Sequence, residues 1–234
     1  MAGSRSLTPR EERLLVRHSR RLNTRDRALI CAQLFLGFRI SETLALTVGH
    51  VLHQGRIRPL VALPPRFLKG GHGTTRVIPV GPELHRALDS YLRTRSRREI
   101  VQRGEPLFLS RETAAGGAPK ALHRSSAERI VKRALLQICA EPHGLSTHTL
   151  RKSWAVRLYD KSGHDIIVVR DGLGHQSVIA TQRYLPIRRA RLVDLILKSD
   201  WTRPAKRESK LHGLASCSIP PGRKFSGHMV GGGP

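Results

Sequence analysis

The sequence predicts a mainly α-helical protein with a small antiparallel β insert, an α+β fold. Apolar residues at helical spacing recur along most of the 234 residues. The pattern is interrupted at residues 55–80, where prolines, glycines and β-branched residues gather. Hydrophobic residues make up 39% of the chain, which is enough for one core. No internal repeat is visible.

The N-terminal part supplies three expected helices. Pro9, followed by two glutamates, is typical of a helix start and leads into EERLLVRHSRRL. A second helix follows Thr24 through RDRALICAQLFL, and its nearly all-round apolarity indicates burial. Ser41 is expected to cap a third helix, ETLALTV, so that Arg39 and Glu42 fall at the junction between two helices.

Residues 55–80 are expected to form the β insert. Prolines at three positions exclude a helix, and two short strand-like runs flank Lys-Gly-Gly-His-Gly, as in a β-hairpin with a glycine-rich tip. Pro82 then begins a helix through ELHRALDSYLRT, and residues 111–120, RETAAGGAPK, have the composition of a loop.

The rest of the chain is expected to be helical as far as a basic tail. Ser125 or Ser126 begins the amphipathic segment AERIVKRALLQICA. Further helices are expected at 147–160, 164–171, 177–184 and 187–198.

These patterns predict one folded domain over residues 11–200. Residues 1–10 are polar and are expected to be frayed. Residues 203–234 are rich in Pro, Gly, Ser and basic residues, and we expect them to form a disordered basic tail.

Charge limits the classes of partner. Lys and Arg total 42 against 17 Asp and Glu, a formal net charge of +25, which favours nucleic acid first and an anionic membrane surface second. No apolar run is long enough to span a bilayer, and the N-terminus lacks the apolar core of a secretory signal, so a cytoplasmic location is expected. Aromatic residues make up only 4%, which favours contact with a duplex backbone over stacking on a single strand.

The cysteines argue against a disulfide framework and against a zinc site. Cys31, Cys139 and Cys217 are odd in number, far apart and without a CxxC pair. Cys31 and Cys139 lie in apolar helical surroundings, where buried thiols are expected.

Four segments contain candidate catalytic residues: FRISE with Arg39, FLKGGHG with Lys69, STHTLRKSW with His148 and Arg151, and LGHQSVIATQRYL with His175 and Tyr184. Each has a simpler explanation when it is taken alone. Arg39 could pair with Glu42 at i+3, and Lys69 could be a solvated lysine. Tyr184 could be a buried ring with a satisfied hydroxyl group.

In this order and at this spacing, the segments make the sequence resemble the tyrosine recombinases, also called the phage integrase family, over about residues 8–200. The pattern contains R-x-x-E at Arg39, a lysine in a β-hairpin, and H-x-L-R at 148–151 followed by SWA. It ends with LGH and a tyrosine nine residues past that histidine. The resemblance implies the recombinase catalytic-domain fold, and cutting and rejoining of duplex DNA through a 3′-phosphotyrosyl intermediate.

The resemblance also implies a role for each candidate residue. Arg39 and Arg151 would clamp the scissile phosphate, whose transition state concentrates negative charge on oxygens that arginine binds well. Tyr184 would attack the phosphorus, although an ordinary tyrosine pKa of about 10 means that nearby cations or a base must help. Lys69 would protonate the leaving 5′-oxygen.

Further residues have supporting roles by the same resemblance. His148 would assist as a base or as a positioning group, His175 would hydrogen-bond the phosphate, and Glu42 would orient Arg39 or the neighbouring backbone. Additional DNA contacts are expected from Arg76, Lys152 and Arg183. No metal or cofactor is required.

Some features depart from the family pattern. Lys152 stands where a histidine often follows the H-x-L-R arginine, and Leu185-Pro186 follows Tyr184 where another histidine is common. Most members carry a separate N-terminal DNA-binding domain, whereas here the catalytic region starts within about ten residues, as in compact single-domain members.

The expected partners are double-stranded DNA, further copies of the chain in a dimer to tetramer on DNA, and accessory DNA-binding proteins. Residues 187–201 carry an apolar stripe that could pack on the chain's own domain or on a neighbouring copy. Two other functions stay open, a catalytically silent basic DNA-binding protein and a type IB topoisomerase-like enzyme that relaxes DNA.

Overall fold

The computed structural model describes residues 4–67, 75–96, 101–113, 119–139, 141 and 143–185. All of them belong to one structural unit, Met1–Ile187. Lys69, Cys217, the expected helix at 187–198 and the expected tail at 203–234 lie outside the described residues.

The first two helices follow the sequence prediction. Helix α1 (Pro9–Ser19) begins with a capping box, in which Thr8 Oγ1 accepts a hydrogen bond from the Glu11 backbone and the Glu11 carboxylate accepts one from the Thr8 backbone. Helix α2 (Thr24–Leu36) is buried on almost all sides and ends at Gly37, whose φ is 62°.

Residues 4–8 differ from the expected frayed start. The Leu7 side chain is only 6% exposed, and the Leu7 backbone donates a hydrogen bond of 2.8 Å to Ser153 Oγ. Arg5 forms an ion pair of 2.6 Å with Glu11. The segment is ordered because Leu7 completes an apolar cluster between α1 and the later helices.

Helix α3 (Ile40–Leu44) begins two residues earlier than predicted, directly after Arg39. The expected cap at Ser41 is wrong because the Glu42 carboxylate accepts the Arg39 backbone N–H at 2.7 Å. The helix is also shorter than predicted, and a separate short helix, α4 (Val48–Val51), follows it.

The predicted hairpin is confirmed by strands β3 (Leu60–Leu63) and β4 (Arg76–Pro79), which pair antiparallel. Two shorter strands precede it and form their own antiparallel pair, β1 (Leu52–His53) and β2 (Arg56–Ile57). A single 3₁₀ turn, η1 (Pro65–Phe67), follows β3. The helix expected after Pro82 is α5 (Pro82–Ser96).

The loop expected at 111–120 is partly wrong. Strands β5 (Leu109–Thr113) and β6 (Pro119–Ala121) form a third antiparallel pair. Their polar composition hides the pairing, which begins beside two buried residues, Phe108 and Leu122, joined by a backbone hydrogen bond of 2.8 Å.

The C-terminal half contains four helices in the described residues: α6 (Arg124–Leu136), α7 (Thr147–Lys161), α8 (Ile166–Leu173) and α9 (Val178–Gln182). Helix α6 begins at Arg124, one or two residues before the predicted start at Ser125 or Ser126, and the ring of His123 caps it by accepting the Ser125 backbone N–H. Asp165 caps α8 by accepting hydrogen bonds from two backbone N–H groups.

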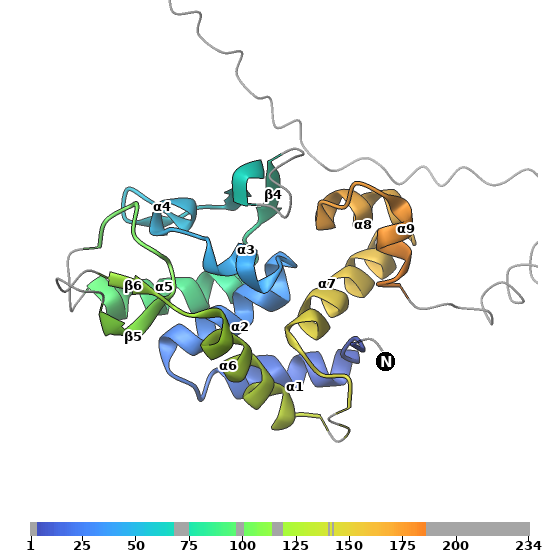
Figure 1. Ribbon diagram of the computed structural model, residues 1–234, viewed down its shortest axis with the longest axis horizontal. Coiled ribbons are helices and arrows are strands. Elements are labelled where there is room, and N and C mark those ends of the chain that lie inside the picture. Colours follow the sequence, from blue (N-terminus) through green and yellow to red (C-terminus); the bar gives the residue numbers. More distant parts are fainter. Residues whose placement is uncertain are drawn as a thin grey trace, which may run out of the picture. The chain divides into compact units, whose positions relative to one another are not determined.

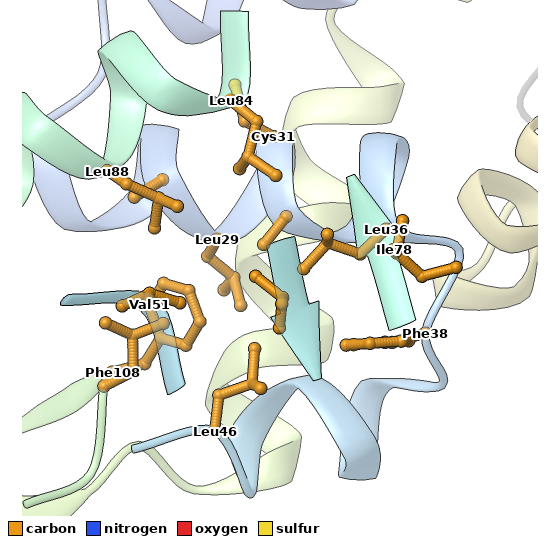
Figure 2. Close-up of a cluster of buried hydrophobic side chains, with 14 of the residues drawn as sticks. Leu29, Cys31, Leu36, Phe38, Leu46, Val51, Ile78, Leu84, Leu88 and Phe108 are labelled. Atoms are coloured by element: carbon orange, nitrogen blue, oxygen red, sulfur yellow. The ribbon is translucent and has the colours of Figure 1, made fainter. Parts of the chain in front are cut away.

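Helix α2 contacts α1, α3, α5, α6 and α7, and it forms the centre of the core (Figure 1). Figure 2 shows side chains of α2 and α5, together with Phe38 and Ile78, as members of the larger apolar cluster. Burial of each such side chain stabilises the fold by about 1.5–3 kcal/mol. This core fixes the positions of α3, β4 and α7, whose polar residues form the site described below.

None of the helices that the structure describes is both long enough and apolar enough to pass through a membrane.

Candidate active site

Glu42 lies at the centre of the site on α3, with 1% of its side chain exposed. Its carboxylate oxygens form ion pairs with Nη1 of three arginines: Arg39 at 2.5 Å, Arg76 at 3.0 Å and Arg151 at 3.5 Å. Burial alone would raise the pKa of Glu42, but Arg151, the Arg39 backbone and side chain, and Arg76 together hold it below its ordinary value. The expectation that Glu42 orients Arg39 agrees with this geometry.

Arg151, on α7, is buried and joins three separate segments. Its Nη1 donates to the Gly37 carbonyl at 2.6 Å, and its Nη2 donates to the Leu173 carbonyl at 2.9 Å. Burial lowers the pKa of Arg151, Arg39 lowers it further, and Glu42 opposes both effects. The buried Nε has no hydrogen-bond partner within the described residues. The guanidinium group therefore faces Glu42 and the C-terminal ends of α2 and α8.

A glycine explains how α7 approaches the end of α2 so closely. A Cβ atom on Gly37 would lie 2.4 Å from Cδ2 of Trp154, and the backbone there is left-handed. Trp154 also donates from Nε1 to the Phe35 carbonyl at 3.0 Å. The Gly37–Trp154 contact holds α7, and with it Arg151, against the segment that carries Arg39.

His175 follows the left-handed Gly174 at the end of α8. Its Nε2 lies 3.2 Å from Arg151 Nη2, and its Nδ1 lies 3.0 Å from Thr181 Oγ1. Burial first, and then the nearby arginines, lower the pKa of His175 to about 4, so the ring is neutral at pH 7. Because arginine only donates, Nε2 accepts, and the ring proton belongs on Nδ1, where it is donated to Thr181.

Tyr184 lies just after α9 and next to both groups. Its ring centroid is 5.2 Å from that of His175, and the Arg151 guanidinium carbon is 5.9 Å from the tyrosine ring centroid. Tyr184 also packs against the larger apolar cluster, as its neighbours in the sequence suggested. A cation at this distance attracts negative charge that develops on the phenol.

His148 and Arg39 border the same site. His148 lies in the first turn of α7, three residues before Arg151, and is exposed. Partial desolvation of the ring, together with Arg151 and other nearby cations, lowers the pKa of His148. Arg39 keeps 27% of its side chain exposed. Of the six catalytic candidates, five lie around this site, and Lys69 lies outside the described residues.

The structure corrects one expected DNA contact and restricts another. Arg76 is 4% exposed and bonded to Glu42 and to the Gly172 carbonyl, so its position does not fit a DNA contact. Lys152 is partly buried and donates to the Ser4 carbonyl at 3.0 Å. Arg183 is exposed, immediately before Tyr184.

The burial of Arg76 was not predicted, although the sequence contains a signal for it. Side chains alternate along β4, so Arg76 shares a face with Ile78, which is buried. An arginine on the inward face of a strand requires a buried partner, and Glu42 is that partner.

The expectation of buried thiols is confirmed for Cys31 and Cys139. Burial raises the pKa of each thiol to about 11. In the parts of the chain that the structure describes, no three His, Cys, Asp or Glu side chains are grouped as metal ligands.

Comparison with known proteins agrees with this arrangement. The model of the phage integrase family matches residues 5–191. The tyrosine recombinase XerD of Mycobacterium leprae (strain TN) is 34% identical over 160 residues, which cover 68% of this chain and 47% of that protein. The chain therefore belongs to the phage integrase family.

Solved structures show the same fold. The crystal structure of XerA recombinase superposes with a TM-score of 0.65 at 22% identity, covering 88% of this chain and 68% of that one. XerH site-specific recombinase, bound to its palindromic difH substrate after cleavage, gives 0.65 at 23% identity, covering 82% and 51%. The chain spans about half the length of the curated relatives that it matches.

Proposed function

We propose that the chain is the catalytic part of a site-specific DNA recombinase that cuts and rejoins duplex DNA through a 3′-phosphotyrosyl intermediate. The observation that carries this proposal is the meeting of Tyr184 with Arg151 and His175, while Arg39 is held on the same carboxylate as Arg151. Membership of the phage integrase family supports it.

In this proposal, Arg39 and Arg151 bind the nonbridging oxygens of the scissile phosphate. Two guanidinium groups match the charge that the transition state adds to those oxygens. Glu42 holds both arginines close together despite their mutual repulsion. Since Arg151 is buried here, its access to a phosphate requires Tyr184 and His175 to make room when DNA binds.

Tyr184 acts as the nucleophile. Its phenol oxygen forms a bond to phosphorus while the bond from phosphorus to the 5′-oxygen breaks, so one phosphodiester replaces another. The phenol proton passes to a base, for which His148 is the proposed group. Lys69 is the proposed donor of the proton that the departing 5′-oxygen takes up.

His175 is proposed to hydrogen-bond the phosphate. In the described structure its Nε2 accepts from Arg151, so a phosphate oxygen placed there would require a proton on Nε2. The negative charge of the phosphate favours that protonation by opposing the arginines that lower the His175 pKa.

Double-stranded DNA is the proposed partner, in keeping with a net charge of +25. We further propose a catalytic domain over residues 11–200, a basic tail that adds backbone contacts, and assembly as a dimer to tetramer on DNA with accessory proteins. The cytoplasm is the proposed location of this activity.

The test is covalent trapping on a library of nicked duplexes with randomised sequence around the nick. The nick lies on the 3′ side of the cleavage point, so the short fragment that carries the new 5′-hydroxyl group diffuses away and the protein stays attached to the other fragment through its 3′-phosphate. We expect DNA that stays bound to protein in a denaturing gel with the wild type and not with Tyr184→Phe, and sequencing of that DNA would give the preferred site. DNA binding by both proteins with no covalent product from either would instead favour a binding-only protein.

A further inference from the structure

Arg76 is a buried cation that the proposed chemistry does not use. It begins β4, is 4% exposed, and has its guanidinium carbon 4.6 Å from the centroid of the Phe38 ring. Burying a guanidinium group is costly unless its donors are paired. Its donors reach two separate segments, Glu42 on α3 at 3.0 Å and the Gly172 carbonyl on α8 at 2.6 Å and 3.2 Å.

The turn that precedes His175 fits closely around this side chain. A Cβ atom on Gly174 would lie 2.5 Å from Cδ of Arg76, and Gly174 has a φ of 64°. The glycine of the LGH motif therefore meets two requirements, a left-handed backbone and room for the stem of Arg76. Because His175 is the next residue, the position of this turn sets the position of the imidazole ring.

Arg76 also shares one oxygen of the Glu42 carboxylate with Arg151. Arg76 lies 3.0 Å from Glu42 Oε2, whereas Arg151 lies 3.5 Å from the same oxygen. Of the two arginine side chains at that oxygen, Arg76 is therefore the closer, and Arg151 keeps its Nε without a partner within the described residues. The ion pair with Arg76 fixes the Glu42 carboxylate, which can then orient both Arg39 and Arg151.

We propose that Arg76 is a positioning residue, which ties the Gly172–Gly174 turn to Glu42 and so sets the directions of His175 and Arg151 toward one phosphate. The inference rests on the proposed function for its effect on cleavage. Its structural part, the link between Arg76 and the His175 ring, can be measured without any DNA.

The first measurement is the tautomer of His175, read by NMR of protein labelled with ¹⁵N in its histidines, in the full-length wild type, Arg76→Met and Arg95→Met. Arg95 is a matched control because it is also 4% exposed and is also paired with a carboxylate, that of Glu105. We expect the Nδ1–H form in the wild type and in Arg95→Met. In Arg76→Met the turn is released, so a mixture containing the Nε2–H form is expected.

The second measurement is single-turnover cleavage of the DNA selected by trapping. A misplacement of about 1 Å can cost about 10²-fold in rate, and we expect a loss of that order in Arg76→Met with DNA affinity unchanged. If the loss reflects misdirected phosphate-binding groups, the fold-difference in cleavage rate between the wild type and Arg76→Met should be smaller on a substrate whose scissile phosphate is replaced by a neutral methylphosphonate. A simple folding defect would slow both substrates equally. Arg76→Lys, which keeps the charge but not the planar fork, replaces the methionine variant if the latter does not fold.

An unchanged His175 tautomer in Arg76→Met would overturn the inference, whether or not the wild type cleaves DNA. Equal cleavage rates in Arg76→Met and Arg95→Met would also overturn it, as would equal losses on the phosphate and methylphosphonate substrates. A wild type that forms no covalent product would reject the proposed function, and the tautomer measurement would still decide the role of Arg76.

Discussion

Replacing Glu42 with glutamine removes the negative charge shared by Arg39, Arg76 and Arg151 but keeps the size of the side chain. The two oxygens of Glu42 face donors only, namely the Arg39 backbone and the side chains of Arg39, Arg76 and Arg151. An amide would turn one N–H₂ group toward these donors and leave three cations without a counter-charge. Breaking such a buried pair costs about 3–5 kcal/mol.

The free energy of unfolding can be measured by urea titration of the wild type, Glu42→Gln and a matched control, Glu83→Gln. Glu83 also serves three arginines, Arg20, Arg27 and Arg86, but it lies nearer the surface, and two of those arginines are more than half exposed. Screened pairs of that kind contribute about 1 kcal/mol or less. Equal losses in the two variants would refute the reasoning.

The same pair of proteins gives a pH test with a defined sign. The native pKa of Glu42 lies below its ordinary value of 4.5, so its stabilising effect is fully present above about pH 4.5. That effect is lost as the pH falls through the native pKa, because the carboxylate then takes up a proton. The difference in stability between the wild type and Glu42→Gln should therefore shrink in acid. A difference that grows in acid would contradict this account.

Three further predictions use other parts of the structure. Gly37→Ala should destabilise the fold by about 1–3 kcal/mol more than Gly163→Ala in urea titrations, because both positions have positive φ but only a Gly37 Cβ meets a neighbour, Trp154. The native pKa of His175 is about 4 against an ordinary value of 6.5, so the unfolded chain takes up this proton first as the pH falls. Between pH 7 and pH 5 the wild type should therefore lose up to about 2 kcal/mol of stability relative to His175→Gln. Parallel stability curves for the two proteins would reject that pKa shift. Arg183→Ala should reduce the slope of log affinity for duplex DNA against log salt by about 1, and Arg95→Met should leave it unchanged, as fluorescence anisotropy at several salt concentrations would show.

Much of the helical framework could be predicted because its signals are local. Pro9 and its following glutamates start α1, and the left-handed glycines at 37 and 174 end α2 and α8, so each signal lies beside the helix end that it marks. The β3–β4 hairpin was predictable for the same reason, since prolines and glycines exclude the alternative.

The errors arose where distant contacts decide the structure. The polar strands β5 and β6 pair beside Phe108 and Leu122, which the local composition of 111–120 does not reveal. Leu7 is ordered by packing against residues far along the chain. Helix α3 is capped at Arg39 and not at Ser41, because the Glu42 carboxylate, which arginines from β4 and α7 hold in place, accepts the Arg39 backbone N–H.

The candidate site shows the same division. The spacing from Arg39 to Tyr184 pointed to a catalytic set, and five of its six members lie around one buried carboxylate. Arg76 was assigned to the wrong place because arginine is usually exposed, and only the inward face of β4 and the charge of Glu42 explain its burial.

The most direct test of the central claim is to identify the amino acid that carries DNA after trapping. Nuclease and protease digestion of the covalent product, followed by mass spectrometry, would locate the remaining nucleotide on one peptide. The chain has three tyrosines, Tyr91, Tyr159 and Tyr184. We predict a nucleotide joined through its 3′-phosphate to Tyr184, and a nucleotide on any other residue, or one joined through its 5′-phosphate, would contradict the proposed mechanism.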